Sequence, residues 1–128
     1  MAFDEERPIY IQIAERMCDE ILSDTYKVGE RIPGVREYSA LLEVNVNTTV
    51  KSYDLLAKKN IIFMKRGLGY YVADNAPQLI KEERKLHFST NILPRIFGQM
   101  KLLGISFEDV EKEWKTFLNN DKTKNENT

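Results

Sequence analysis

The sequence has little of the chemistry on which enzymes and secreted proteins rely. Its 128 residues include one cysteine, Cys18, and one histidine, His87. A single cysteine excludes an intrachain disulfide and favours a reducing compartment, where Cys18 would be a small apolar core residue. Cys18 and His87 also fall in different predicted helices, so no Cys–His pair or metal ligand set is visible. We therefore expect no catalytic residue, no metal site and no cofactor.

Long apolar runs are also missing. No stretch approaches the ~20 apolar residues that span a membrane, and the first ten residues, MAFDEERPIY, lack the apolar core of a signal peptide. No phosphate-binding glycine loop is visible, because Gly67 and Gly69 fall in a predicted hairpin and not before a helix. These absences predict a cytoplasmic chain with no membrane contact. The content of 42% hydrophobic and 30% charged residues predicts a packed core.

The chain has no overall positive charge, since its formal net charge is −1. Taken alone, this value argues against nucleic-acid binding, which depends on clustered lysine and arginine. The charge is unevenly distributed, however, because residues 27–74 hold eight basic side chains against five acidic ones. A local excess of this size is common on solvated surfaces, so it permits DNA binding without establishing it.

Apolar periodicity predicts two helices before residue 43. The first begins at Pro8 and ends near Tyr26, with apolar residues recurring every three to four positions. A loop with glycine and proline follows, and the second helix covers residues 35–42. The residues expected on the buried face of this second helix are Val35, Tyr38, Leu41 and Leu42.

A third helix is predicted over residues 46–59, because Asn45 is a good N-cap and Asn60 can end the helix in a left-handed turn. The residues expected to be buried on it are Val46, Val50, Tyr53, Leu56 and Ala57. The pattern then becomes extended: residues 61–64 and 70–73 are rich in strand formers and flank a basic segment with two glycines. This predicts a hairpin with a basic tip.

Beyond Pro77, apolar residues recur at sevenfold spacing, which is typical of a coiled-coil-like seam. Pro94 interrupts this stripe, so we expect a kink or a restart there. Gly104 ends the element, and Ser106 can cap a last helix. That helix should bury Phe107, Val110, Trp114, Phe117 and Leu118. The residues expected in a dimer interface are Leu79, Leu86, Leu93, Ile96, Met100, Leu103 and Trp114.

Three helices followed by a hairpin form the order of a winged helix-turn-helix. The predicted fold class is therefore mainly α with a small β-hairpin. We expect a DNA-binding domain over 1–76, a helical dimerisation region over 77–120 and a disordered tail over 121–128. In this fold the third helix enters the major groove and the hairpin follows the backbone as a wing. The residues expected to face double-stranded DNA on these two elements are Asn45, Asn47, Thr48, Lys51, Lys65, Arg66 and Gly67.

Three segments resemble the DNA-binding domain of the GntR family of bacterial regulators: GERIPGVRE at 29–37, VNVNTTVKSYD at 44–54 and RGLGYYV at 66–72. The short helical tail, with LLGIS at 102–106, is similar to the YtrA-like branch of that family. The resemblance implies a homodimeric repressor on a pseudo-palindromic operator, and it implies that Arg36 contacts DNA. Two positions depart from the family pattern. Gly34 replaces a capping serine, and Val46 replaces a proline or polar residue.

Two alternatives stay open at this point. The same fold also serves as a protein-interaction module without specific DNA binding, and the net acidity favours that interpretation slightly. A small-molecule effector could also bind in a cleft lined by Tyr70, Tyr71, Phe88 and Phe97, although packing explains these aromatic residues as well.

Overall fold

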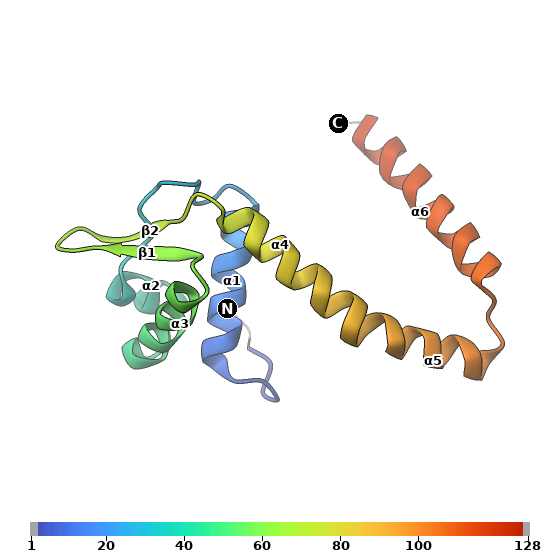
Figure 1. Cartoon of the computed structure of the whole chain (residues 1–128), viewed down its shortest axis with the longest axis horizontal. Coiled ribbons are helices and arrows are strands. Elements are labelled where there is room, and N and C mark those ends of the chain that lie inside the picture. Colours follow the sequence, from blue (N-terminus) through green and yellow to red (C-terminus); the bar gives the residue numbers. More distant parts are fainter. Residues whose placement is uncertain (1–2, 127–128) are drawn as a thin grey trace. The chain divides into compact units, whose positions relative to one another are not determined.

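The computed structural model describes residues 3–126, which form helices and one hairpin (Figure 1). The chain divides into two compact units, with the division between Arg84 and Lys85. The first unit contains α1 (Ile9–Leu22), α2 (Val35–Leu42), α3 (Val46–Lys58), β1 (Ile62–Lys65), β2 (Gly69–Val72) and most of α4 (Ala76–His87). The second contains η1 (Phe88–Ile92), α5 (Leu93–Leu103) and α6 (Phe107–Glu126). The mainly helical class with a small hairpin is thus confirmed.

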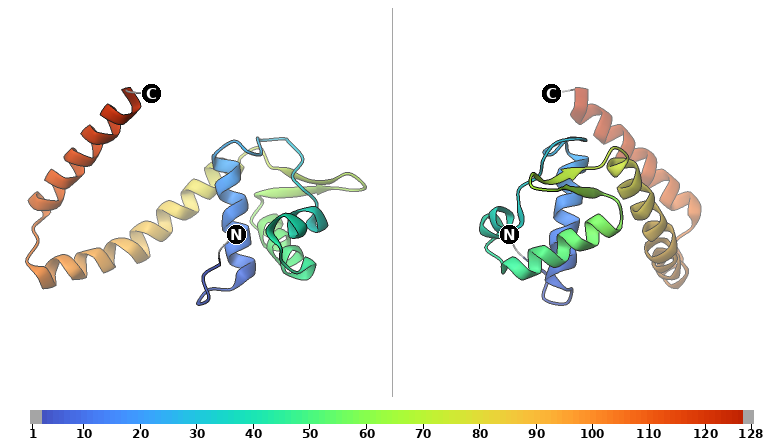
Figure 2. Two further views of the ribbon diagram at one scale, coloured as in Figure 1. Left: turned by 180° about the vertical axis from the view of Figure 1, so that it is seen from behind. Right: turned by 60° about the vertical axis from the view of Figure 1, so that its left-hand side comes forward.

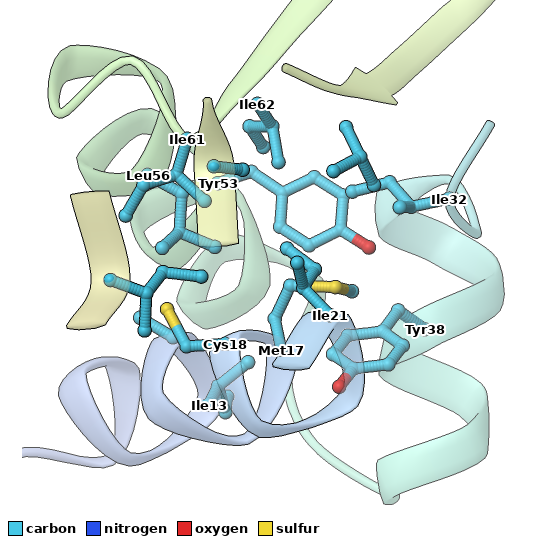
Figure 3. Packing of buried hydrophobic residues seen from close by; sticks show 14 of the residues in the cluster. Ile13, Met17, Cys18, Ile21, Ile32, Tyr38, Tyr53, Leu56, Ile61 and Ile62 are labelled. Atoms are coloured by element: carbon cyan, nitrogen blue, oxygen red, sulfur yellow. The ribbon is translucent and has the colours of Figure 1, made fainter. Parts of the chain in front are cut away.

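The core of the first unit lies between its three N-terminal helices. Helix α3 packs against both α1 and α2 (Figure 2). Figure 3 shows Tyr38 and Tyr53 pointing into this core beside Met17 and Ile21 of α1. The Tyr38 hydroxyl donates to Glu20 Oε1 at 2.6 Å, and the Tyr53 hydroxyl donates to the Pro33 carbonyl at 2.6 Å. Burial raises the pKa of both hydroxyls, so they remain neutral donors. The Tyr38 hydroxyl joins α2 to α1, and the Tyr53 hydroxyl joins α3 to the loop before α2.

Cys18 belongs to the same core. Its side chain is buried, and burial raises the pKa of the thiol to about 11. The thiol therefore stays protonated near neutral pH and is a poor nucleophile. This agrees with the structural role expected from the sequence.

Helix α1 ends earlier than its apolar pattern predicts. Its last residue is Leu22 instead of Tyr26, because Asp24 adopts a left-handed conformation with φ 63°. The Ser23 amide donates to the Asp19 carbonyl at 2.9 Å and the Thr25 amide to the Glu20 carbonyl at 2.8 Å, which satisfies carbonyls at the helix end. The loop to α2 therefore starts four residues sooner than expected.

The hairpin pairs β1 and β2 in antiparallel register, with Ile62 opposite Val72 and Lys65 opposite Gly69. A segment before α2 extends this pair, since Arg31 bridges Tyr71 and the Ile32 amide donates to the Tyr70 carbonyl at 3.0 Å. The hairpin is thus anchored on its β2 side to the loop that leads into α2.

Most of α4, up to Arg84, belongs to the N-terminal unit. Ala76 and Ile80 are buried with the core, so the first unit ends eight residues beyond the predicted boundary at residue 76. An ion pair between Arg84 and Asp19 (2.7 Å) ties α4 to α1, and a pair between Lys59 and Glu83 (2.7 Å) ties it to the end of α3. Exposed ion pairs add little stability, so the apolar contacts determine where this unit ends.

The second unit shows an irregularity next to Pro94, where the sequence predicts a kink or a restart: the π-helical segment η1 ends just before α5, which carries Pro94 in its first turn, and the backbone stays helical between them. Proline removes one helical amide donor, which is a recognised cause of such irregularity. Gly104 ends α5 with φ 69°. The Asp109 amide donates to Ser106 Oγ and the Ser106 amide to Asp109 Oδ2, each at 3.1 Å, which forms the reciprocal cap of α6.

Two predictions for α6 are wrong for the single chain. The helix continues to Glu126, so the tail expected to be disordered from residue 121 is helical over 121–126; residues 127 and 128 lie outside the described part. The apolar residues expected to be buried are exposed in the chain, at 70%, 37%, 57%, 60% and 40% for Phe107, Val110, Trp114, Phe117 and Leu118. A helix of this kind needs a partner surface to cover its apolar stripe.

Across residues 3–126, no helix combines the length and apolar character needed to cross a membrane.

Candidate DNA-binding surface

The N-terminus of α3 is fixed by Asn45. The Asn45 side-chain oxygen accepts the Asn47 amide at 2.8 Å, and its backbone is extended, with φ −65° and ψ 137°. This geometry satisfies one of the free amides of the first turn. Asn45 therefore has a structural role as the N-cap, as predicted, and its remaining side-chain amide group is exposed.

The face of α3 that meets the core is only partly the one expected: Tyr53 and Leu56 are buried as predicted, but the valines of the first half are not. Thr49 and Ser52 are fully buried, whereas Val50 is 37% exposed and Val46 is half-buried. The buried hydroxyls are satisfied: Ser39 Oγ donates to Thr49 Oγ1 at 2.7 Å, and Ser52 Oγ donates to the Tyr10 carbonyl at 2.7 Å. Hydrogen bonds to α2 and α1 thus allow polar residues to take the places that hydrophobicity alone assigns to valine.

The outward face of α3 carries Asn47, Val50, Lys51 and Asp54, which are all exposed. At about 100° per residue, Asn47 lies between Val50 and Lys51 around the helix axis. The Lys51 ammonium lies 4.0 Å from the centre of the Tyr10 ring of α1. This cation–π contact holds the lysine beside the first turns of α3, where base edges would be read.

Helix α2 presents Arg36 at its N-terminus. Gly34 is the N-cap, with φ −65° and ψ 165° and no capping side chain, as its place in the sequence predicts. Arg36 is exposed, as an arginine that contacts DNA must be. The face predicted for α2 is partly wrong, since Leu41 is 62% exposed and Ser39 is buried in its place through its hydrogen bonds to Val35 and Thr49.

The predicted basic residues of the hairpin lie at its tip, which extends beyond α2 and α3 (Figures 1 and 2). Lys65, Arg66 and Gly67 are exposed, and Gly67 takes the left-handed φ of 78° that the turn requires. The Lys65 ammonium lies 4.3 Å from the centre of the Tyr71 ring, which is itself stacked on Phe63. A pair of aromatic rings thus supports the lysine of the wing.

Arg31 holds the tip of the hairpin. Its Nε donates to the Leu68 carbonyl at 2.9 Å across 37 residues of sequence. Gly69, with φ 112°, permits this approach, because a Cβ there would lie 3.0 Å from Arg31 Nε. Arg31, Tyr10 and Tyr71 are positioning residues that the sequence did not identify. Arg31 and Tyr10 act on residues distant along the chain, and Tyr71 acts on Lys65 across the hairpin.

The structure therefore brings seven of the eight predicted DNA-facing residues to exposed positions of one compact unit. These are Arg36, Asn45, Asn47, Lys51, Lys65, Arg66 and Gly67. Thr48 is the exception, since it is half-buried and its carbonyl accepts Ser52 Oγ at 3.1 Å. A threonine in this position has less access to a base than its neighbour Asn47.

The aromatic residues considered for an effector site have separate roles. Tyr70 is half-buried and meets Tyr53 edge to face at 5.1 Å, whereas Tyr71 lies under Lys65 in the wing. Phe88 and Phe97 belong to the second unit and are 45% and 55% exposed. Tyr70 and Tyr71 are thus explained by packing and by support of the wing.

The predicted dimer residues fall into two groups. Leu79 is half-buried in the first unit, and Leu93 and Met100 are half-buried in the second. The others are exposed, with Leu86 at 68%, Ile96 at 39%, Leu103 at 69% and Trp114 at 57%. Trp114 also stacks on Phe117 with ring centres 6.0 Å apart, which forms an exposed aromatic patch on α6.

Two substitutions of Asn45 separate capping from DNA contact. Asn45→Ala removes the acceptor for the Asn47 amide and should lower the free energy of unfolding by about 1 kcal/mol. Asn45→Asp keeps the cap and should leave the melting temperature unchanged or higher, but its charge should repel phosphates and weaken DNA binding several-fold. Thermal unfolding and DNA titration at one salt concentration test both. Equal affinity of the wild type and Asn45→Asp would show that Asn45 is a cap alone.

Comparison with known proteins places this geometry among bacterial regulators. Residues 9–72 match the family described as bacterial regulatory proteins, gntR family. The chain is 31% identical to the HTH-type transcriptional regulator YhcF of Bacillus subtilis, over 90% of this chain and 93% of that protein. It is 32% identical to the HTH-type transcriptional repressor YtrA of the same organism, over 84% and 81% of the two chains. A crystal structure of a GntR-family transcriptional regulator from Bacteroides thetaiotaomicron superposes with a TM-score of 0.79 at 41% identity, covering 88% and 98% of the two chains.

Proposed function

Because this chain belongs to the GntR family of bacterial regulatory proteins, in its YtrA-like branch, it is a DNA-binding transcriptional regulator, and we propose that it is a repressor that binds a pseudo-palindromic operator as a homodimer. One chain would supply one recognition helix, α3, and one wing. Two chains related by a two-fold axis would then read two half-sites about one helical turn apart. The proposal places the protein in the cytoplasm, where the chromosome is, and assigns it no catalytic activity.

The observation that supports DNA contact is the distribution of exposed polar side chains over α2, α3 and the hairpin tip. Arg36, Asn47 and Lys51 lie on the helices, and Lys65 and Arg66 on the wing. Asparagine can pair with an adenine edge, and arginine with guanine or phosphate. Lys51 and Lys65 rest on aromatic rings at 4.0 and 4.3 Å, so less of their freedom is lost on binding.

The observation that supports a homodimer is the exposed apolar surface of the second unit. Leu86, Leu103 and Trp114 are each more than half exposed in the single chain. Large apolar side chains exposed in such number mark an interaction site, and a second copy of the chain carries the same residues. Repression is inferred from the similarity to YtrA, which is a repressor.

The experiment that tests the proposal is selection of bound sequences from a random duplex pool, followed by measurement of affinity against salt concentration. An enriched inverted repeat with a steep salt dependence is expected. Enrichment of a single, unrepeated half-site would contradict dimeric binding. Absence of any enrichment would favour either the protein-interaction alternative or a required small-molecule effector. Repeating the selection with metabolites from a cell extract would separate the two, because only a required effector would restore enrichment.

Arg36 should make one of the specific contacts. Arg36→Ala should weaken operator binding by about 1–3 kcal/mol and relax the preference at one base pair if the guanidinium reads a base. Arg36→Lys is the matched variant, because it keeps the charge but loses the bidentate geometry. Operator titrations of both variants on single-base-pair substitutions give the measurement. Affinity that survives in Arg36→Lys would assign Arg36 to phosphate, and affinity that survives in both would remove it from the interface.

A further inference from the structure

The recognition helix carries an apolar side chain on its DNA-facing side. Val50 is 37% exposed, although valine is among the residues most often buried, and it lies next to Asn47 on the outward face of α3. Val46 precedes it by four residues, so the two side chains lie on the same side of the helix, with Val46 half-buried. The core does not account for Val50, because Thr49 and Ser52 occupy the core-facing positions around it.

We infer that Val50, supported by Val46, reads the C5-methyl group of a thymine in the major groove. This inference rests on the proposed operator binding by α3 and adds the chemistry of one contact. In the major groove, thymine alone among the four bases presents a methyl group, and apolar side chains recognise it. Around the helix, Asn47 separates the apolar Val50 from the basic Lys51, so the face offers an apolar contact, an amide and a cation in sequence.

Val50 lies in the part of α3 that can approach the bases. It lies in the second turn of α3, and the N-terminal residues of a recognition helix are those that approach base edges. Asp54, one turn further on, would meet the phosphates unfavourably if the helix entered more deeply. The first two turns are therefore the part of α3 that can contact bases closely.

The test uses the full chain and the operator obtained by selection, with deoxyuridine replacing thymine at one position at a time. Deoxyuridine lacks only the methyl group. At one thymine of each half-site, the replacement should lower wild-type affinity about fourfold, the fold-change that corresponds to about 0.8 kcal/mol for one buried carbon. Val50→Ala should bind the thymine operator more weakly and should lose the difference between thymine and deoxyuridine at that position.

The matched control is Val28→Ala. Val28 is 43% exposed in the loop between α1 and α2, so this substitution removes the same atoms from a similarly exposed position away from α3. It should retain the full deoxyuridine effect. Because Val50 is exposed, Val50→Ala should fold normally, and an unchanged melting temperature verifies this.

The outcomes separate the methyl contact from the proposed function. A wild-type chain that prefers the operator over a scrambled duplex but is insensitive to every deoxyuridine would overturn the methyl contact alone. A thymine effect that persists in Val50→Ala would assign it to another side chain and overturn the role of Val50, leaving this exposed valine for a protein partner. A wild-type chain with no preference for any duplex would overturn the proposed function itself.

Discussion

Leu103→Glu is expected to convert the protein to a monomer and to lower operator affinity by a factor of about 10²–10⁴. Leu103 ends α5 and is 69% exposed in the single chain, so the substitution leaves the fold of that chain intact. If Leu103 lies in the dimer interface, however, the glutamate would place a carboxylate there without an opposite charge, which is strongly unfavourable. The decrease in affinity arises because each half-site would then be bound separately. Sedimentation velocity and operator titration measure the two effects.

Leu102→Glu is the control for this experiment. Leu102 is 85% exposed and lies outside the predicted seam, so the same charge is introduced one position away. It should leave the dimer largely intact. If both variants remain dimeric, the seam in α5 is not the interface, and the stacked Trp114 and Phe117 of α6 become the next residues to substitute. If only the Leu102→Glu variant becomes a monomer, the protein is a dimer but Leu102, and not Leu103, lies in its interface.

Removing three cations from the DNA-facing surface should have the second large effect. In the variant Lys51→Ala, Lys65→Ala and Arg66→Ala, the operator affinity should fall at least about a hundredfold near 0.1 M salt. The dependence of log affinity on log salt concentration should also flatten by about 0.9 for each phosphate that the variant no longer neutralises. All three side chains are exposed and none forms an ion pair among those identified within residues 3–126, so folding should be little affected.

The control variant changes the net charge by the same amount elsewhere. Lys101→Ala, Lys112→Ala and Lys115→Ala remove three exposed lysines from α5 and α6. If the dimer persists, this variant should keep nearly all of its affinity and its salt slope. Equal decreases in affinity for the two triple variants would show that affinity depends on total charge and not on where the charges lie. This would contradict the assignment of α3 and the wing as the DNA-binding surface.

The helices and the hairpin could be predicted because each leaves a local signal. The cap at Asn45, the end of α5 at Gly104 and the cap at Ser106 all depend on neighbours within a few residues, and the structure confirms them. The exposed place of Lys65 likewise follows from the order of elements, whereas Arg36 was indicated by the resemblance to the GntR family. Local chemistry was sufficient at these points.

Hydrophobicity predicted the buried residues in the second half of α3, Tyr53 and Leu56, but not those in its first half. A threonine and a serine displace a valine from the core because their hydroxyls find partners on α2 and α1, and the Ser52 hydrogen bond to Tyr10 spans 42 residues of sequence. The support of Lys51 by Tyr10 and the clamp of Arg31 on Leu68 have the same character. Pairings between distant residues leave no periodic trace in one sequence, so both the buried hydroxyls and the positioning residues became visible only in the fold.

If the exposed apolar residues of α5 and α6 pair two chains, as proposed, they also make the regulator sensitive to its own abundance. On the proposed arrangement, only the paired form binds the operator tightly, and below the dissociation constant of the pair its concentration rises with the square of the chain concentration. Doubling synthesis would then raise the active species about fourfold. A small change in gene dosage or in proteolysis would thus move the target promoter between open and closed states more steeply than a monomeric binder could.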